Sequence, residues 1–234
     1  TYDPASEIML TVGGSEAIDV ALRTIINPGD EVIYIQPSYV SYLPCILLAD
    51  GVPVTVPTKK ENGYKATVDD LAACFTEKTK AIVINTPCNP TGMLYSKEEL
   101  QAIADFVVEK DIYIISDEMY ENLVYGDAKH VSIASLNDEI YKRTITVSGV
   151  AKSYAMTGWR IGYAGASAEI AKLMSSVQSH STSNPNSIAQ KATEEALLGP
   201  QDTVEIMRKE FDARRKYMFS RVSTMPHVSC LEPQ

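Results

Sequence analysis

The chain has 234 residues, and 45% of them are hydrophobic, which is enough apolar material for one large domain or two small ones. A formal net charge of -9 argues against a nucleic-acid or anionic-membrane partner, because a polyanion would be repelled, and it favours a small-molecule ligand. Four cysteines at wide spacing lack the Cys-x-x-Cys or Cys and His pattern of a zinc site, so we expect reduced thiols and no metal.

Short β-branched runs alternate with helical patterns along the chain. This alternation predicts a mostly parallel seven-stranded sheet covered by helices on both faces, a three-layer αβα fold. The predicted strands are rich in Val, Ile, Tyr and Thr, as strands buried on both faces are. They are Ile8–Val12, Glu31–Gln36, Pro53–Val56, Ala81–Asn85, Ile112–Ser116, Thr144–Ser148 and Arg160–Ala164.

Helices are predicted between and after these strands. Ser96 followed by Glu99 has the capping-box pattern, in which hydroxyl and carboxylate each satisfy a free backbone N–H. The turn at residues 27–30, Asn-Pro-Gly-Asp, is one that a helix cannot cross. The predicted helices are Ser15–Ile26, Tyr39–Ala49, Val68–Phe75, Ser96–Lys110, Ala168–Ser179, Pro185–Leu198 and Gln201–Ser223.

The ends of the chain raise the question of completeness. The sequence starts at Thr1 without Met and stops at Gln234 shortly after a helical pattern, so we expect a fragment. Residues 1–215 are predicted to form one α/β domain and residues 216–234 to begin a second. No run approaches about 20 apolar residues and no signal-peptide pattern is present, so we expect a cytoplasmic protein.

Unusual residues follow the predicted strands, at the edge of the sheet where open α/β folds bind ligands. Gly13-Gly14-Ser15-Glu16-Ala17 follows the first strand and opens a helix, whose free N–H groups and dipole favour an anion such as phosphate. Alone, such a turn is more often structural. After the second strand, Tyr39 could present its flat face to a heteroaromatic ring or could be a core tyrosine.

Two further strand ends carry polar side chains. The run Asn85–Gly92 packs turn formers together, which predicts a rigid loop with a cis proline that holds the Asn89 amide in one orientation. Asp117 follows the fifth strand at the mouth of an apolar sheet, where an unpaired charge would cost several kcal/mol. Asp117 therefore needs a cationic partner; an ordinary salt bridge or a helix-capping role is the alternative.

The most specific pattern follows the sixth strand. Lys152 is flanked by small and apolar residues, which predicts a partly buried amine, and burial favours its neutral, nucleophilic form. Arg160 lies eight positions later, on the seventh predicted strand, where its planar fork could grip a phosphate. Such lysine-to-arginine spacing within a glycine-rich frame indicates a ligand site.

Together these runs resemble the class I aminotransferases, enzymes that use pyridoxal 5'-phosphate (PLP), and most closely their aspartate and aromatic amino-acid branch. The resemblance covers nearly the whole chain. It implies that Lys152 forms the Schiff base with PLP and that Asp117 pairs with the pyridinium nitrogen. It further implies that Tyr120 and Asn89 hydrogen-bond the phenolic oxygen and that Tyr39 stacks on the ring.

The same resemblance implies a phosphate site and a dimer. The phosphate would be held by Gly14, Ser15, Glu16 and Arg160. The run Ser179–Pro185 resembles a segment that members with aspartate activity carry near the dimer interface. Family members also have an N-terminal arm with a tyrosine that reaches the neighbouring subunit's phosphate, and a small domain whose arginine binds the substrate's α-carboxylate. Neither is in this sequence, which puts activity of this chain by itself in doubt.

The resemblance implies amino-group transfer from an amino acid to a 2-oxo acid by a ping-pong mechanism, with Lys152 moving the Cα proton. Alternatives stay open, because the same cofactor site serves β-lyases, decarboxylases and racemases. A non-catalytic PLP-binding module and a remnant that binds nothing are further alternatives. The last is opposed by the set Asp117, Lys152 and Arg160.

The remaining chemistry-bearing side chains are read as structural. His130, His180 and His227 have no partners in the sequence for metal or triad chemistry, and we expect structural or surface roles. Trp159, the only tryptophan, is expected to pack in the core beside Arg160.

Overall fold

One seven-stranded sheet runs through the protein, for which a computed structural model describes residues 1–234. The strand order across the sheet is β1-β7-β6-β5-β4-β2-β3. The strands are β1 (Ile8–Thr11), β2 (Glu31–Gln36), β3 (Val52–Pro57), β4 (Thr79–Asn85), β5 (Tyr113–Asp117), β6 (Thr144–Gly149) and β7 (Gly162–Gly165). The seven predicted strands are all present.

Strand direction decides which chain segments meet at one edge of the sheet. The pairs β2–β3, β2–β4, β4–β5 and β5–β6 are parallel, whereas β7 is antiparallel to both β6 and β1, so the predicted mostly parallel sheet is confirmed. Because β7 runs opposite to β6, its first residue, Gly162, lies beside the last residue of β6, Gly149. Thr11, at the end of β1, also pairs with Gly162. The ends of β1, β5 and β6 and the start of β7 therefore converge.

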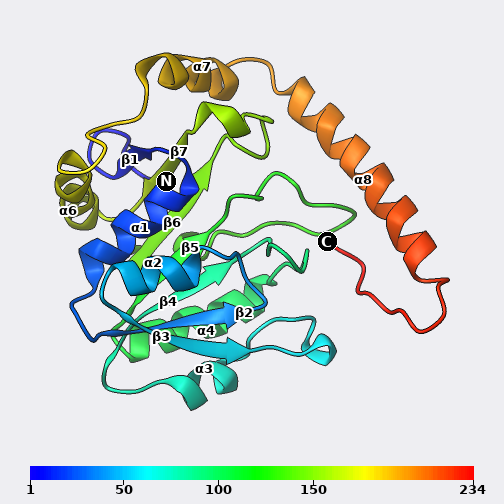
Figure 1. The fold of residues 1–234 in the computed structure, drawn as a ribbon, viewed down its shortest axis with the longest axis horizontal. Helices are drawn as coiled ribbons and strands as arrows, with labels where there is room; N and C mark the ends of the chain where they lie inside the picture. The colour runs from blue at the N-terminus through cyan, green and yellow to red at the C-terminus, as the bar shows by residue number, and fades with distance from the viewer.

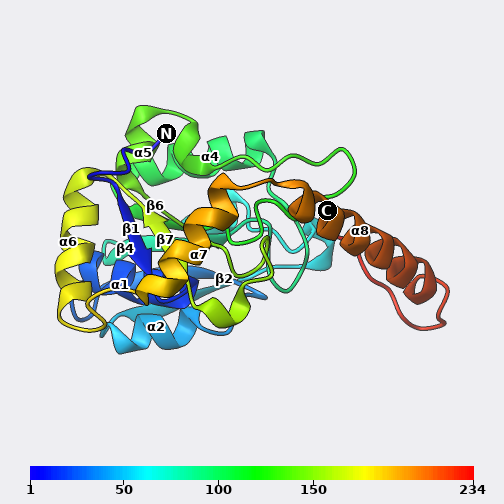
Figure 2. The same cartoon turned by 90° about the horizontal axis from the view of Figure 1, so that it is seen from above.

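Two layers of helices cover the sheet, one on each face (Figure 2). Helices α1, α2 and α6 pack on one face, and α3, α4 and α5 pack on the other. Helices α7 and α8 follow the last strand, and α8 projects away from the sheet (Figure 1). The helices are α1 (Gly14–Ile25), α2 (Tyr42–Leu48), α3 (Val68–Cys74), α4 (Lys97–Glu109), α5 (Asp138–Arg143), α6 (Ala168–Ser179), α7 (Ser187–Leu198) and α8 (Asp202–Val222).

The sheet has two separate hydrophobic cores because both of its faces are buried. In β2, Val32 and Tyr34 pack in the core under α1 and α2, whereas Ile33 and Ile35 pack in the core over α4. The same alternation recurs in β4 and β5, as the two-residue period of a strand requires. A third, smaller cluster joins Val150, Met156 and Ile161, which follow β6, to Ala189 of α7.

Several predicted boundaries hold. Strand Glu31–Gln36 and helix Ala168–Ser179 have the predicted bounds. The Ser96 capping box is confirmed: Glu99 N donates to Ser96 Oγ at 3.2 Å, and Ser96 N donates to the Glu99 carboxylate at 2.7 Å. No helix is both long and apolar enough to cross a membrane.

Other boundaries differ from the prediction. Helix α2 begins at Tyr42, three residues after the predicted start, and α5 was not predicted. Arg160 does not lie on a strand: it follows the short 3-10 turn Thr157–Trp159 with a φ of 55°, and β7 begins only at Gly162. The expected domain boundary at 215/216 falls inside α8 and stays a prediction.

Candidate functional site

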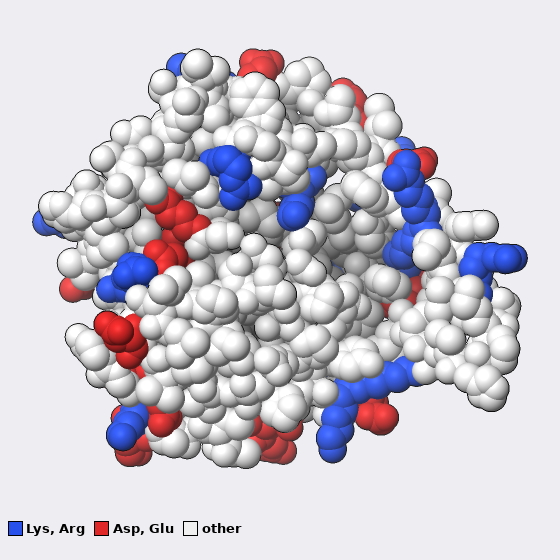
Figure 3. All heavy atoms as spheres, in the orientation of Figure 1, with Lys and Arg blue, Asp and Glu red and all other residues white.

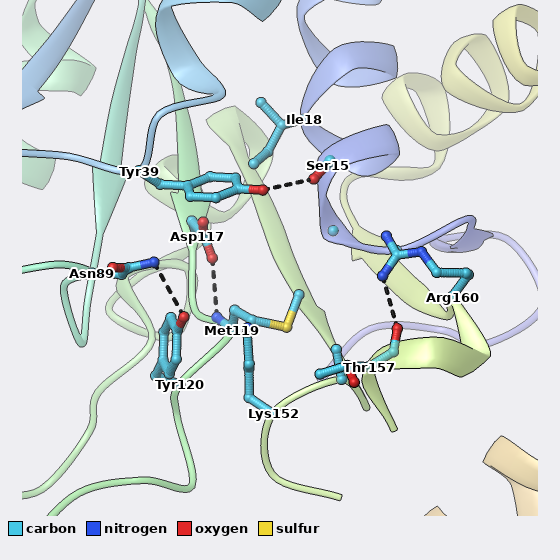
Figure 4. A pocket seen from close by; sticks show the side chains of 13 residues that line it. Ser15, Ile18, Tyr39, Asn89, Asp117, Met119, Tyr120, Lys152, Thr157 and Arg160 are labelled. Atoms are coloured by element: carbon cyan, nitrogen blue, oxygen red, sulfur yellow. Dashed lines mark hydrogen bonds between the residues drawn. The ribbon is translucent and has the colours of Figure 1, made fainter. Parts of the chain in front are cut away.

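A pocket lies at the edge where the strand ends converge (Figure 4). Every predicted site residue except Glu16 lines it. The lining residues are Gly13, Gly14, Ser15, Ile18, Tyr39, Asn89, Asp117, Met119, Tyr120, Ala151, Lys152, Thr157 and Arg160.

Asp117 presents a buried acid to this pocket. It is 6% exposed, and its two oxygens accept hydrogen bonds from the Tyr42 hydroxyl at 2.6 Å and the Met119 N–H at 3.1 Å. None of the protein's ion pairs involves it, so the alternative of an ordinary salt bridge fails. Burial raises the pKa of Asp117, and the Tyr42 hydrogen bond opposes that rise. The site therefore favours a cationic ligand group.

Lys152 lies on the turn after β6. Its half-buried side chain reaches into the pocket, with Nζ 5.8 Å from the centroid of the Tyr120 ring, and its amine forms no ion pair (Figure 4). The turn is fixed on both sides of Lys152, because Val150 and Met156 are buried against α7. A primary amine is thus held in reach of the ligand that Asp117 would bind.

Asn89 and Tyr120 form a polar pair at one end of the pocket. Asn89 Nδ2 donates to Tyr120 Oη at 3.2 Å. The loop is held by buried Asn85, whose Oδ1 accepts from Asn89 N at 2.6 Å and whose Nδ2 donates to the Asp117 carbonyl at 2.9 Å. The predicted cis proline is present, with cis bonds before Pro87 and Pro90. Sequence reasoning did not single out Asn85, which ties β4 to β5 across the site.

Arg160 and the start of α1 form the opposite end of the pocket (Figure 4). Arg160 Nη1 donates to the Thr157 carbonyl at 2.9 Å, and the guanidinium lies against Gly13, where an added Cβ would stand 2.4 Å from Nη2. Ala17 is the first residue of α1 whose backbone N–H donates to an earlier carbonyl, that of Gly13. The backbone N–H groups that precede it in the helix have no partner within the helix, as is usual at a helix start. This end is suited to an anion.

Glu16 departs from the prediction. Its carboxylate accepts hydrogen bonds from Val12 N, from Gln178 Nε2 and from the Thr182 hydroxyl. The side chain therefore faces the loop after α6, which carries the run Ser179–Pro185, and does not line the pocket. A phosphate contact of Glu16 is limited to its backbone N–H.

Tyr39 lies across the pocket from Lys152 (Figure 4). Its hydroxyl is 3.2 Å from Ser15 Oγ, and its ring meets that of Tyr42 edge to face with centroids 5.8 Å apart. The side chain is half-buried and lines the pocket, so the alternative of a core tyrosine is not what the structure has.

Of two expectations about side chains outside the pocket, the core position of Trp159 is wrong, whereas a structural role of His130 is not contradicted. His130 does have a partner: its Nε2 lies 2.9 Å from Glu118 Oε2, and Glu118, 1% exposed, also accepts from two serines. With Glu121, these groups place three potential metal-ligand atoms within 4.8 Å of one another. Trp159 is 47% exposed and is not a core residue, because its turn lies at the surface.

The pocket can hold PLP on the evidence of its own groups. It offers an amine for an aldehyde, a buried acid for a ring nitrogen, an amide and phenol pair for a ring oxygen, and an anion site at the far end.

On the face shown in Figure 3, Lys and Arg groups lie apart from one another with acidic groups among them, so this face has no broad basic patch.

The sequence is similar to those of known aminotransferases. The family model described as "Aminotransferase class I and II" matches residues 1–234. An aspartate aminotransferase from Bacillus sp. (strain YM-2) is 46% identical over 233 residues, which is 100% of this chain and 59% of that protein. An aromatic-amino-acid aminotransferase from Thermococcus litoralis is 43% identical over 225 residues, or 95% of this chain and 58% of that protein.

Solved structures agree. The aromatic aminotransferase from Pyrococcus horikoshii OT3 matches with a TM-score of 0.96 at 43% identity, covering 100% of this chain and 62% of that one. The aspartate aminotransferase from Rhizobium meliloti matches with a TM-score of 0.97 at 35% identity, covering 100% and 58%. This chain thus spans about 59% of the length of its curated relatives.

Proposed function

The chain belongs to the class I and II aminotransferase family, and from that premise we propose that it forms the cofactor-holding part of a PLP-dependent aminotransferase. The whole protein would transfer an amino group from an amino acid, aspartate or a related or aromatic one, to a 2-oxo acid. Curated relatives named aspartate, asparagine and aromatic aminotransferases support this substrate class.

One observation carries the proposal. Asp117 and Lys152 line a single pocket, and Asp117 is a buried acid without a cationic side chain as partner. Leaving a charge buried and unpaired is costly, so such an acid is retained where a ligand supplies the cation. A protonated pyridine nitrogen meets that need while the aldehyde of the same molecule reaches the amine.

Different residues of the chain have different roles in this reaction. When bound, PLP supplies an electron sink for the bonds of the substrate's Cα atom. Lys152 Nζ anchors the cofactor and then moves the proton from that Cα atom. Asp117 holds the proton on the ring nitrogen. Arg160 and the start of α1 hold the phosphate, and Tyr39 covers one face of the ring.

Tyr120 keeps its proton for hydrogen bonding. Burial raises the pKa of Tyr120, so the phenol stays neutral at physiological pH. Because Asn89 donates to the phenol oxygen, the O–H of Tyr120 remains available to donate to the ring oxygen. The pair thereby fixes the ring's orientation between its nitrogen and phosphate ends.

The proposal is tested first by titrating the chain with PLP and following the visible absorption of the bound cofactor. The complete protein is then given a panel of amino acids with 2-oxo acids, and both products are measured. Transfer conserves the amino group as a new amino acid. Release of ammonia or sulfide would instead identify a lyase, binding without turnover would identify a non-catalytic module, and absence of binding would refute the assignment.

We also propose that the protein is a homodimer in the cytoplasm. Several large apolar side chains near the site are exposed. Val40 directly follows Tyr39 in the sequence, and Ile188 and Leu198 lie on the neighbouring helix α7. A second subunit would cover such side chains. The cysteines are unpaired, in keeping with a reducing compartment. Sedimentation of the complete protein tests the dimer.

A further inference from the structure

Tyr42 is joined to the site by a single buried contact. It is the first residue of α2, is 1% exposed and packs within the core under α1. Its hydroxyl donates to Asp117 Oδ2 at 2.6 Å and has no other hydrogen-bond partner. Tyr42 does not line the pocket, and 75 positions separate it from Asp117 along the chain.

The two oxygens of Asp117 are held in different ways. Oδ1 accepts from Met119 N within the same turn, a contact that any side chain at position 119 except proline would keep. Oδ2 depends on the Tyr42 side chain alone. Since a hydrogen bond to an ionised group is worth more than one to its neutral form, this contact acts on the charge of the acid as well as on its direction.

We propose that Tyr42 is a positioning residue that holds Asp117 ionised and aimed at the ring nitrogen of bound PLP. The inference rests on the proposed function and deepens it. A phenol O–H pointing at Oδ2 stabilises the carboxylate, because the carboxylate is the better acceptor. It also leaves Oδ1, with one backbone donor, as the oxygen able to accept from the ring.

Tyr42 affects the position of a proton shared between Asp117 and the cofactor. Asp117 and the ring nitrogen compete for it, and the ring draws electrons well only while the proton stays on nitrogen. Burial and the neighbouring Glu118 raise the pKa of Asp117, which pulls the proton toward the acid; the Tyr42 hydrogen bond and Lys152 lower it. Without the Tyr42 hydroxyl, the acid would hold the proton more often.

The test removes only that hydroxyl, with Tyr42→Phe in the complete protein. The matched control is Tyr34→Phe, because Tyr34 is also buried in the same core and its hydroxyl bonds Gln36 and Thr55, away from the site. Three quantities are compared: the dissociation constant of PLP, the pH midpoint of the bound cofactor's visible absorption, and kcat against KM.

Tyr42→Phe should lower kcat by about 10- to 100-fold, the range for one hydrogen bond to a charged group, with a smaller change in KM. The dissociation constant of PLP should rise. The pH midpoint of the visible absorption should also rise. When the ring nitrogen loses its positive charge, the Lys152 nitrogen joined to the same cofactor keeps its proton to a higher pH. Tyr34→Phe should change none of these. Unaltered values in Tyr42→Phe, or an equal loss in Tyr34→Phe, would overturn the proposal.

Two further measurements keep the result decisive. In an Asp117→Asn background Tyr42→Phe should have almost no additional effect, since Tyr42 acts through that carboxylate; additive losses would refute it. If Tyr42→Phe fails to fold, a fluorinated tyrosine at position 42, a stronger donor of equal shape, should move the pH midpoint down, and no movement would refute the proposal. Failure of the unaltered protein to bind PLP would instead refute the proposed function.

Discussion

Replacing Gly13 by alanine is expected to damage the anion end of the pocket selectively. Gly13 has a φ of 82°, in the region where a side chain is strained, and a Cβ built there would stand 2.4 Å from Arg160 Nη2 and 3.1 Å from its Cζ. The arginine is held on the other side by its bond to the Thr157 carbonyl, so the guanidinium must shift from its present place beside α1.

The size of the effect can be estimated in two parts. The positive φ costs the folded protein about 1–2 kcal/mol whether or not a ligand is present. Shifting Arg160 should cost about one charge-assisted hydrogen bond to the phosphate, worth about 1.5–3 kcal/mol, so the dissociation constant of PLP should rise about 10- to 100-fold. Pyridoxal, which lacks the phosphate, should bind Gly13→Ala nearly as it binds the unaltered protein.

The assay is a titration of the protein with PLP and with pyridoxal, followed by visible absorption. Gly126→Ala is the matched control, because Gly126 also has a positive φ, of 64°, but a Cβ there meets nothing within 4 Å. It should lose comparable stability and keep its affinity for PLP. The reasoning fails if Gly13→Ala binds PLP normally, or if it weakens pyridoxal by the same factor.

Three other predictions concern the amine, the acid and a helix start. Lys152→Ala should lose the visible absorption band given by PLP, and a variant that keeps the band would remove Lys152 from its role. In the PLP-free protein the raised pKa of Asp117 lets the folded state keep a proton that the unfolded chain has released, so the free energy of unfolding should fall as pH rises between the ordinary and the raised pKa. Urea unfolding at several pH values should show a shallower fall in Asp117→Asn; equal slopes would contradict the assignment. Ser96→Ala should lose about 0.5–2 kcal/mol in urea unfolding through its capping box, and Ser135→Ala, at an exposed 3-10 turn, serves as the comparison.

The architecture was predictable because its signals are local. The central strands β2, β4, β5 and β6 are short β-branched runs buried on both faces, and helix α4 has its own start signal, the capping box at Ser96. The six-residue helix α5 escaped prediction because it is too short to show a helical period and is set mainly by the Asn137 side chain, which caps its first turn.

The site was predictable where strand ends define it and unpredictable where distant side chains meet. Asp117 closes β5 and Lys152 lies on the turn after the neighbouring strand β6, so their convergence follows from the sheet. The Tyr42 contact joins residues 75 positions apart, and no spacing reveals it. Arg160 was expected on a strand because its neighbours are apolar, whereas its φ of 55° places it in a tight turn.

Because β7 runs opposite to β6, the connection from residue 150 to residue 161 must span a fixed distance. It is pinned at both ends by the pairing of Gly149 with Gly162, and it carries both Lys152 and Arg160. Sliding β7 by one residue would turn its side chains to the wrong face, so the strands cannot absorb a change in loop length. An inserted or deleted residue would have to alter the span between amine and guanidinium, which sets how long a molecule the pocket can grip at both ends.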